Sequence, residues 1–162
     1  MKKGRGKRKG SSFERDIAKE LSLWISKEVR NDIFWRTHSS GSLGTVGGRR
    51  LEYGDIMAID DLGKPLTDNW NIECRCGRCL DTRHLIYPAP KNSSIIQLIE
   101  EGMTNARLSW RKSLWIIKEH AKPIMVMCQH KEFQTTSFES VYFPKYDLVI
   151  ISFDLWKKEF KL

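Results

Sequence analysis

The sequence predicts a single α/β domain, in which helices flank a mixed β-sheet and the elements follow the order α-β-β-β-α-β. Apolar residues recur at helical spacing near the N-terminus. Three strand-like segments follow, and a further helical region then leads to a short apolar strand after Pro123. The length of 162 residues and the 40% content of hydrophobic residues suit one domain with a substantial core.

The first helix is predicted from Ser11 to about Val29. Its apolar positions share one face, and they are Phe13, Ile17, Leu21, Trp24 and Ile25. Ser11 is a residue type that commonly caps a helix N-terminus. We therefore expect residues 1–10 to form a basic disordered tail and residues 11–162 to form the folded domain.

Three strands are predicted next, at 32–37, 55–60 and 70–76. A polar, glycine-rich loop at 38–50 separates the first two, and a turn at 61–65 separates the second from the third. We expect these three strands to form a meander.

Two helices are predicted in the second half, a short one at 94–101 and a longer one at 104–122. Trp110, Leu114 and Ile117 would face the core from the longer helix. A strand at 124–128 follows, and two more strand candidates lie at 137–143 and 148–153. Most of the six tryptophans fall within these elements, so we expect most of them to be core residues.

The charge balance points to a polyanionic partner. The chain has 28 Lys and Arg against 20 Asp and Glu, and six of these cations lie in the first nine positions. Such a basic segment suits nucleic acid, although it could instead be a solubilising tail. No apolar run is long enough to span a membrane and no secretory signal is recognisable, so we expect a soluble, cytoplasmic protein. Four cysteines, three of them crowded together, do not resemble a disulfide framework.

Two short motifs carry the chemistry: Gly54-Asp55, and Glu73-Cys74-Arg75 downstream. If the second motif is a strand, alternation puts Glu73 and Arg75 on one face and Cys74 on the other. If Asp55 joins them from a neighbouring strand, two carboxylates and a cation converge where a hydrated divalent metal could sit. That combination is typical of a metal-dependent phosphodiesterase.

This spacing resembles the PD-(D/E)xK nuclease superfamily, particularly its archaeal and phage Holliday junction resolvase-like branch, and the similar element order extends over about residues 11–153. The resemblance implies a restriction-endonuclease-like core that cuts branched DNA with Mg²⁺, or with Mn²⁺ in its place. It implies that Asp55, Glu73 and the backbone carbonyl of Cys74 hold the metal. It also implies a gene of phage or mobile-element type, and a two-fold symmetric substrate would favour a homodimer.

The sequence departs from the superfamily pattern at two positions. Gly54 stands where the superfamily has proline, and Arg75 stands where it has lysine. Arginine keeps the positive charge but stays protonated, so it cannot act as a general base. Arg75 could stabilise charge in the transition state. The alternative is a cleavage-dead relative in which Arg75 only pairs with Glu73 or Asp55.

The resemblance also implies that a glutamate of the first helix reaches the metal site, and Glu14 matches it. Ser11 and Glu14 could instead form a capping box, in which Glu14 bonds back to the Ser11 amide.

An Arg- and Ser-containing loop follows the first strand in the resolvase-like branch. The corresponding candidates for DNA contact here are Arg36, Ser39, Ser40, Arg49 and Arg50. Glycines in this loop would permit close approach to a phosphate backbone, whereas an ordinary surface loop would have the same composition.

A rival motif overlaps the site. Cys74, Cys76, Cys79 and His84 are four candidate zinc ligands, but their spacing would make a cramped site. We expect Cys74 and Cys128 to be buried thiols. Cys76, Cys79 and His84 remain an alternative zinc site, and the corresponding alternative function is a non-catalytic, zinc-stabilised DNA-binding protein.

Overall fold

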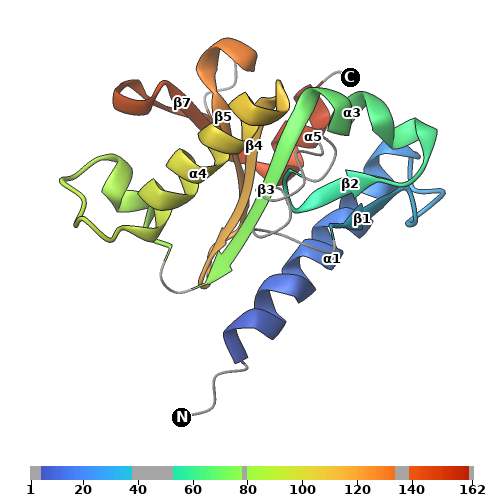
Figure 1. The fold of residues 1–162 in the computed structure, drawn as a ribbon, viewed down its shortest axis with the longest axis horizontal. Coiled ribbons are helices and arrows are strands. Elements are labelled where there is room, and N and C mark those ends of the chain that lie inside the picture. The colour runs from blue at the N-terminus through green and yellow to red at the C-terminus, as the bar shows by residue number, and fades with distance from the viewer. Residues whose placement is uncertain (1–4, 38–52, 78–79, 134–138, 161–162) are drawn as a thin grey trace.

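The computed structural model describes residues 5–37, 53–77, 80–133 and 139–160, with side chains from residue 10 onward (Figure 1). Its centre is a mixed five-stranded sheet with the strand order β3-β4-β5-β7-β6. The strands are β3 (Trp70–Gly77), β4 (Lys112–Glu119), β5 (Ile124–Gln129), β6 (Val141–Phe143) and β7 (Leu148–Ser152). β3 and β4 are parallel, and the other neighbouring strands are antiparallel. The predicted α/β class with a mixed sheet and flanking helices is confirmed.

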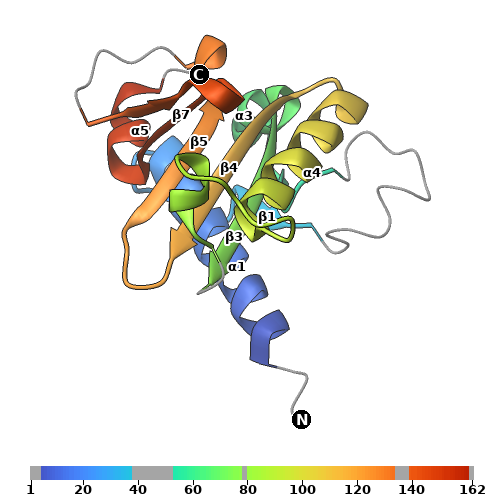
Figure 2. The same ribbon diagram turned by 90° about the vertical axis from the view of Figure 1, so that its left-hand side faces the viewer.

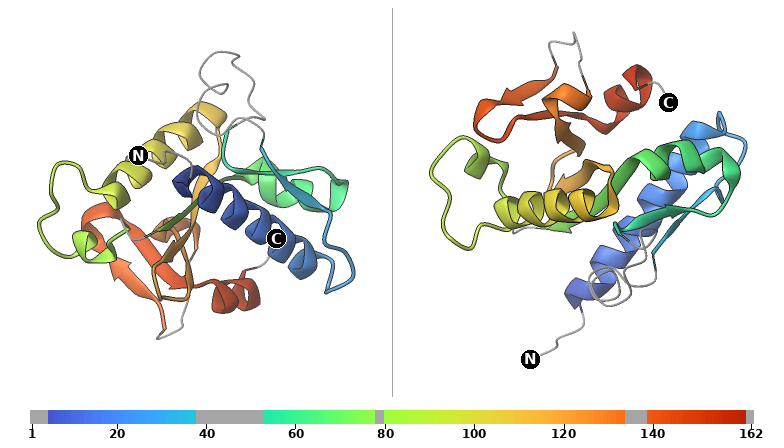
Figure 3. Two further views of the ribbon diagram at one scale, coloured as in Figure 1. Left: turned by 90° about the horizontal axis from the view of Figure 1, so that it is seen from below. Right: turned by 45° about the horizontal axis from the view of Figure 1, so that its top comes forward.

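Helices cover both faces of this sheet, as Figures 2 and 3 show. On one face, α1 (Arg5–Ile25) and α5 (Phe153–Glu159) bury alternate strand residues such as Ile116. On the opposite face, α4 (Ser94–Ser109) buries the intervening residues, among them Trp115. The central strands therefore have apolar side chains on both faces, which is why their sequences read as continuous hydrophobic runs.

The first helix is longer than the sequence predicts. α1 begins at Arg5, so Ser11 lies inside the helix rather than at its N-cap, and the basic tail predicted at 1–10 stays a prediction. The predicted apolar face is confirmed, since Ile17 and Leu21 are fully buried. The alternative capping box of Ser11 and Glu14 needs Ser11 at the N-terminus of the helix, and this position inside α1 does not allow it.

A separate two-stranded antiparallel sheet joins β1 (Phe34–Arg36) to β2 (Ile56–Ala58). The buried Ser22 hydroxyl of α1 accepts hydrogen bonds from the N–H groups of Ile33 and Phe34, at 3.1 and 2.9 Å. This contact fixes the start of β1 on α1. The predicted meander is therefore correct for the first two strands and wrong for the third, because β3 starts the larger sheet.

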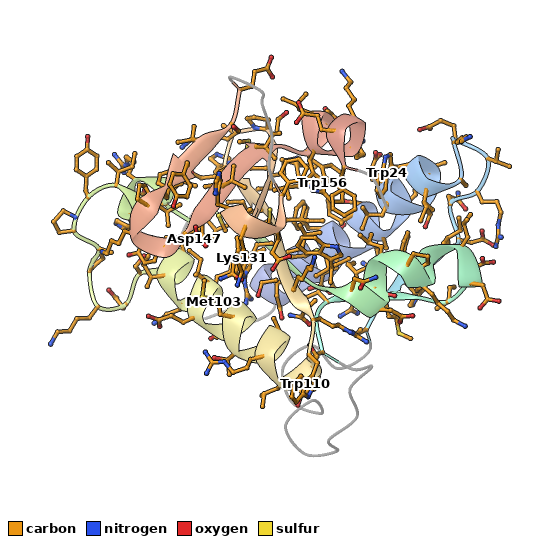
Figure 4. All side chains as sticks on the ribbon, turned by 90° about the horizontal axis from the view of Figure 1, so that it is seen from above. Trp24, Met103, Trp110, Lys131, Asp147 and Trp156 are labelled. Carbon is orange, nitrogen blue, oxygen red and sulfur yellow. The ribbon has the colours of Figure 1, made fainter. Side chains whose placement is uncertain are left out.

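Two short helices lie where the sequence predicts a turn and a charged C-terminal end. α3 (Lys64–Asn69) follows the predicted turn, and α5 ends the described chain. α5 packs on α1, where the Trp24 and Trp156 rings lie 5.2 Å apart between centroids (Figure 4). The described residues also include four 3₁₀ turns: Asp61–Gly63, Thr82–Leu85, His130–Glu132 and Pro144–Tyr146. Within the described residues, no helix is long and apolar enough to cross a membrane.

The largest error of the sequence reading concerns 104–122, which was predicted as one helix. α4 instead ends at Ser109, Trp110 adopts a left-handed backbone with φ of 58°, and the chain continues as β4. Leu114 and Ile117 are buried as predicted, but they belong to the strand. A short apolar run buried on both sides cannot be assigned by periodicity alone. Apart from the short helix α3 between β2 and β3, the α-β-β-β-α-β order holds, because β4 takes the place expected for 124–128.

The tryptophans are only partly in the core. Trp70, Trp115 and Trp156 are buried, whereas Trp35 is 46% exposed and Trp110 is 83% exposed. The predicted inward orientation of Trp110 is therefore wrong.

Close packing of α4 on β4 depends on a glycine. β3, α4 and β4 form a crossover between parallel strands, and α4 must lie flat on both. A Cβ atom at Gly102 would collide with the indole of Trp115, whose Nε1–H donates to the Leu98 carbonyl at 3.1 Å. The absence of a side chain at Gly102 thus sets the distance between helix and sheet.

We predict that Gly102→Ala lowers the melting temperature. Alanine is favoured over glycine in a helix by about 1 kcal/mol, yet the collision with a fully buried indole outweighs that gain. Thr104→Ala, at an exposed position of the same helix, serves as the control and should change the melting temperature little. A Gly102→Ala protein that melts at or above the wild-type temperature would contradict this packing.

Candidate active site

The free edge of β3 positions Asp55. β4 pairs with one edge of β3, and on the other edge the Asp55 N–H donates to the Ile72 carbonyl at 2.7 Å. In return, the Cys74 N–H donates to Asp55 Oδ2 at 2.8 Å. Asp55 is therefore held by its backbone and by its side chain. The predicted approach of Asp55 to the Glu73-Cys74-Arg75 strand is found in the structure.

The Cys74 carbonyl faces the same side as Asp55. In a β-strand, the N–H and C=O groups of one residue point to the same edge, and this direction alternates along the strand. Since the Cys74 N–H and the Ile72 carbonyl both bond to Asp55, the Cys74 carbonyl also faces that edge. The Cys74 side chain packs in the core on the α1 side of the sheet, as expected.

Gly54 explains why this chain has no proline before the aspartate. Its φ is +90°, and an added Cβ would lie 2.9 Å from both Asn71 Oδ1 and the Ile72 carbonyl. Proline holds φ near −65°, so it cannot adopt this backbone. Thr37 fixes the same turn, because its hydroxyl donates to the Gly54 carbonyl at 2.7 Å. A glycine is therefore required where the chain passes closely over β3.

Two asparagines hold the Glu73 carboxylate. Asn71 Nδ2 and Asn105 Nδ2 each donate to Glu73 Oε1, both at 3.0 Å. The sequence reading missed both residues. Asn71 could have been found, because it lies two positions before Glu73 on the same strand face. Asn105 comes from α4, and no sequence signal links it to β3.

One oxygen of each carboxylate, Asp55 and Glu73, accepts no hydrogen bond from the described residues. The hydrogen bonds to Glu73 go to Oε1 and the hydrogen bond to Asp55 goes to Oδ2. In the described part of the chain, no donor reaches Glu73 Oε2 or Asp55 Oδ1. In the same residues, no three His, Cys, Asp or Glu side chains converge closely enough to hold a metal. A metal shell here would therefore combine the two open oxygens with the Cys74 carbonyl and solvent, which suits an oxygen-preferring ion.

Burial, and to a smaller extent the negative charge of Glu73, raise the pKa of Asp55 to about 7. The Cys74 N–H and the positive charge of Arg75 oppose this rise, and Glu14 adds to it. Burial also raises the pKa of the Cys74 thiol well above its usual value, so this thiol stays protonated. The other three residues predicted as catalytic, Glu14, Glu73 and Arg75, therefore all lie within electrostatic reach of Asp55.

Glu14 and Arg36, which were predicted for separate roles, pair with each other. Arg36 Nε donates to Glu14 Oε2 at 2.9 Å, and both side chains are largely buried. The pair links α1 to β1. Glu14 faces the site closely enough to raise the pKa of Asp55, whereas Arg36 compensates its charge.

Arg75 does not pair with Glu73 or Asp55. Its ion-pair partner is Glu101 of α4, at 3.7 Å, and the side chains of both residues are more than half exposed. The alternative in which Arg75 forms a closed internal bridge with the metal carboxylates therefore has no support in this geometry.

Several predicted residues cannot be placed. Ser39, Ser40, Arg49 and Arg50 of the glycine-rich loop lie outside the described residues, as does Cys79. Cys74, Cys76 and Cys128 form no disulfide, as expected, and burial raises the pKa of the Cys128 thiol to about 12.

His84 of the rival zinc motif has other polar neighbours. His84 Nδ1 shares a hydrogen bond with the Ser93 hydroxyl at 2.9 Å, and His84 Nε2 lies 3.9 Å from an Asp81 carboxylate oxygen. Because Cys79 lies outside the described residues, the zinc site of Cys76, Cys79 and His84 stays a prediction.

The raised pKa of Asp55 predicts a pH-dependent stability in EDTA. Unfolded Asp55 ionises near pH 4 and folded Asp55 near pH 7. Between these values the unfolded state binds fewer protons, so the free energy of unfolding falls as pH rises. Asp55→Asn keeps an acceptor for the Cys74 N–H and carries no charge. At pH 8 we expect it to be more stable than the wild type by up to about 4 kcal/mol, which is the free energy that a shift of this size represents.

This difference should shrink as the pH falls and should be lost below pH 4, where Asp55 becomes protonated in both states. Urea unfolding of both proteins across this range measures it. A constant difference at all pH values would show that ionised Asp55 is not destabilised by its surroundings.

Comparison with known proteins agrees with this geometry. A family model described as "Phage putative PDDEXK endonuclease" matches residues 5–162, a range that includes every candidate site residue. No curated protein and no solved structure gives a match. The match confirms the resemblance inferred from the Gly54-Asp55 and Glu73-Cys74-Arg75 motifs. The chain therefore belongs to a phage endonuclease family of the PD-(D/E)xK nuclease superfamily.

Proposed function

We propose that this protein is a Mg²⁺-dependent endonuclease that hydrolyses phosphodiester bonds of DNA. One observation carries the proposal: Asp55 and Glu73 each have one oxygen fixed by hydrogen bonds and one oxygen open, beside the Cys74 carbonyl on the free edge of β3. Three oxygen donors of this kind fit Mg²⁺ or Mn²⁺, and solvent and a phosphate oxygen can fill the remaining positions.

The bound ion would supply an activated water and would offset negative charge on the phosphate. Asn71 and Asn105 fix the orientation of Glu73, so that its second oxygen faces the site before the ion arrives. The Cys74 N–H likewise fixes the orientation of the Asp55 carboxylate. Arg75 carries a positive charge on the side-chain face of β3 that also bears Glu73, where it can stabilise a phosphate.

Charge supports a DNA substrate. The net charge is +8, and four cations of the N-terminal basic segment, Arg5, Lys7, Arg8 and Lys9, belong to α1. A basic helix end of this kind can follow a phosphate backbone. We further propose branched DNA as the preferred substrate, a homodimer as the acting form and the cytoplasm as the location. These three proposals rest on the resolvase-like pattern of the motifs.

Cleavage should require both the metal and Asp55. We expect labelled four-way or linear DNA to be cut with Mg²⁺ and not with EDTA. Asp55→Asn should lose cleavage by a factor of at least about 10² while keeping its fold, because a preorganised contact to the reacting charge is removed. Asp68→Asn removes an exposed carboxylate from α3 and should cleave as the wild type does.

Full activity of Asp55→Asn would refute the assignment of Asp55. A wild-type protein that binds DNA but cleaves none of these substrates with Mg²⁺ or Mn²⁺ would favour the non-catalytic DNA-binding alternative.

Arg75 should contribute to the rate rather than to stability. We expect Arg75→Lys to preserve or raise single-turnover cleavage, because lysine keeps the charge and approaches a phosphate more flexibly. Arg75→Ala should lower the rate by a factor on the order of 10². Glu101→Gln breaks the same ion pair without removing the cation, so it is the matched control and should cleave at nearly the wild-type rate. Equal rates for Arg75→Ala and wild type would exclude Arg75 from the reaction.

A further inference from the structure

Trp110 has the highest exposed fraction among the large hydrophobic side chains of the described residues, at 83%. It lies at the C-terminal tip of α4, and Met103 lies farther back on the same helix (Figure 4). Its backbone is held in place, because the Arg111 N–H donates to the Ala106 carbonyl at 2.9 Å and closes the last turn. The indole thus stands on a fixed backbone and faces solvent.

The fold gives no reason for tryptophan at this position. Glycine or asparagine is the usual residue at a left-handed helix end, and a bulky side chain there costs free energy. The φ of Trp110 is 58°, and its ring forms no aromatic or cation–π contact among the described residues. The neighbouring Leu108 is also exposed, at 55%. An exposed apolar group held on a rigid, unfavourable backbone marks a contact with another molecule.

Trp110 is connected to the candidate active site through α4 and β4. Asn105, which donates to Glu73, precedes it by about one and a half turns of α4, or about 7 Å along the helix axis. Lys112, two residues after Trp110, pairs in register with Trp70 at the start of β3. Because bases on one strand are spaced about 3.4 Å apart, a ligand on Glu73 could reach Trp110 within a few nucleotides.

The surrounding charge favours a nucleic acid. Residues 107–112 include Arg107, Arg111 and Lys112 and contain no acidic residue, although Lys112 Nζ already pairs with Glu132 at 2.6 Å. Arg107 is exposed beside the indole. Cations that bind phosphates around an exposed aromatic ring form the usual combination for unpaired bases, because the ring stacks on the base while the cations hold the backbone.

We propose that Trp110 stacks on an unpaired base of the DNA substrate, beside the phosphate that the active site holds. The inference rests on the proposed function and narrows the substrate to DNA with unpaired bases. Bases within a continuous duplex are already stacked on each other, so an indole gains little there. DNA with unpaired bases at a branch, bulge or end offers a free base face. Trp110 therefore selects for substrates with unpaired bases near the cleaved bond.

Binding in EDTA tests this stacking without cleavage. The two probes are a short labelled blunt duplex and the same duplex with unpaired thymines at its centre. Trp110→Asn suits the left-handed backbone and should fold normally. We expect it to lower affinity for the bulged DNA roughly tenfold and to change affinity for the blunt duplex by less than about twofold. Trp110→Phe keeps a ring and should retain most of the affinity.

Tyr87→Ala is the matched control, because Tyr87 is a 63% exposed aromatic residue that precedes the N-terminal end of α4. This control should change neither the affinity for the bulged DNA nor the affinity for the blunt duplex. Equal losses for both DNAs in Trp110→Asn, or no loss for either, would overturn the inference. So would an unchanged DNA affinity with an altered sedimentation coefficient, which would assign Trp110 to a contact between copies of the chain.

The two proposals fail in different ways. A wild-type protein that prefers bulged DNA through Trp110 but never cleaves it would refute the nuclease proposal and support the stacking. Metal-dependent cleavage with no effect of Trp110→Asn on binding would support the nuclease proposal and refute the stacking.

Discussion

The free edge of β3 is the constraint on which the rest of the structure depends. A strand edge presents N–H and carbonyl groups that need partners, and here Asp55 satisfies two of them. The same two hydrogen bonds attach the β1-β2 sheet to the five-stranded sheet and bring the Asp55 carboxylate to Glu73. Fold and site are therefore held by one contact, and Gly54 is the residue whose backbone permits it.

This arrangement has an electrostatic cost. Asp55 and Glu73 are both buried, at 7% and 8% exposure, and the charge of Glu73 raises the free energy of ionising Asp55. Neutral donors from Asn71, Asn105 and the Cys74 amide lower this cost without adding a cation that would occupy the open oxygens. The charge that would fully compensate two carboxylates is thus left to a ligand. Such local instability is typical of functional sites, where the surrounding structure maintains a geometry that is unfavourable by itself.

The sequence predicts the parts of the molecule that depend on local pattern. The buried face of α1 and the strand β3 follow from periodicity, and the order of Asp55 and Glu73 identifies the carboxylates. β4 could not be predicted, because its run of apolar residues satisfies a helical pattern as well as a strand. Asn105 could not be predicted either, since its contact with Glu73 depends on how α4 crosses β3. The pairing of Glu14 with Arg36 is likewise a product of tertiary structure, because it joins residues from two elements that only packing brings together.

The environment of Arg75 suggests how an arginine could serve where the superfamily has lysine. Its ion pair with Glu101 is long, at 3.7 Å, and exposed, so it contributes little free energy and is easily exchanged. A phosphate offers the guanidinium two charge-assisted hydrogen bonds in a planar arrangement, which Glu101 does not supply at this distance. A proposed DNA substrate would therefore compete well for Arg75. α4 carries Glu101, which pairs with Arg75, and Asn105, which donates to Glu73, and Trp110 follows at the end of the helix. A substrate bound along α4 would therefore contact all three of these residues.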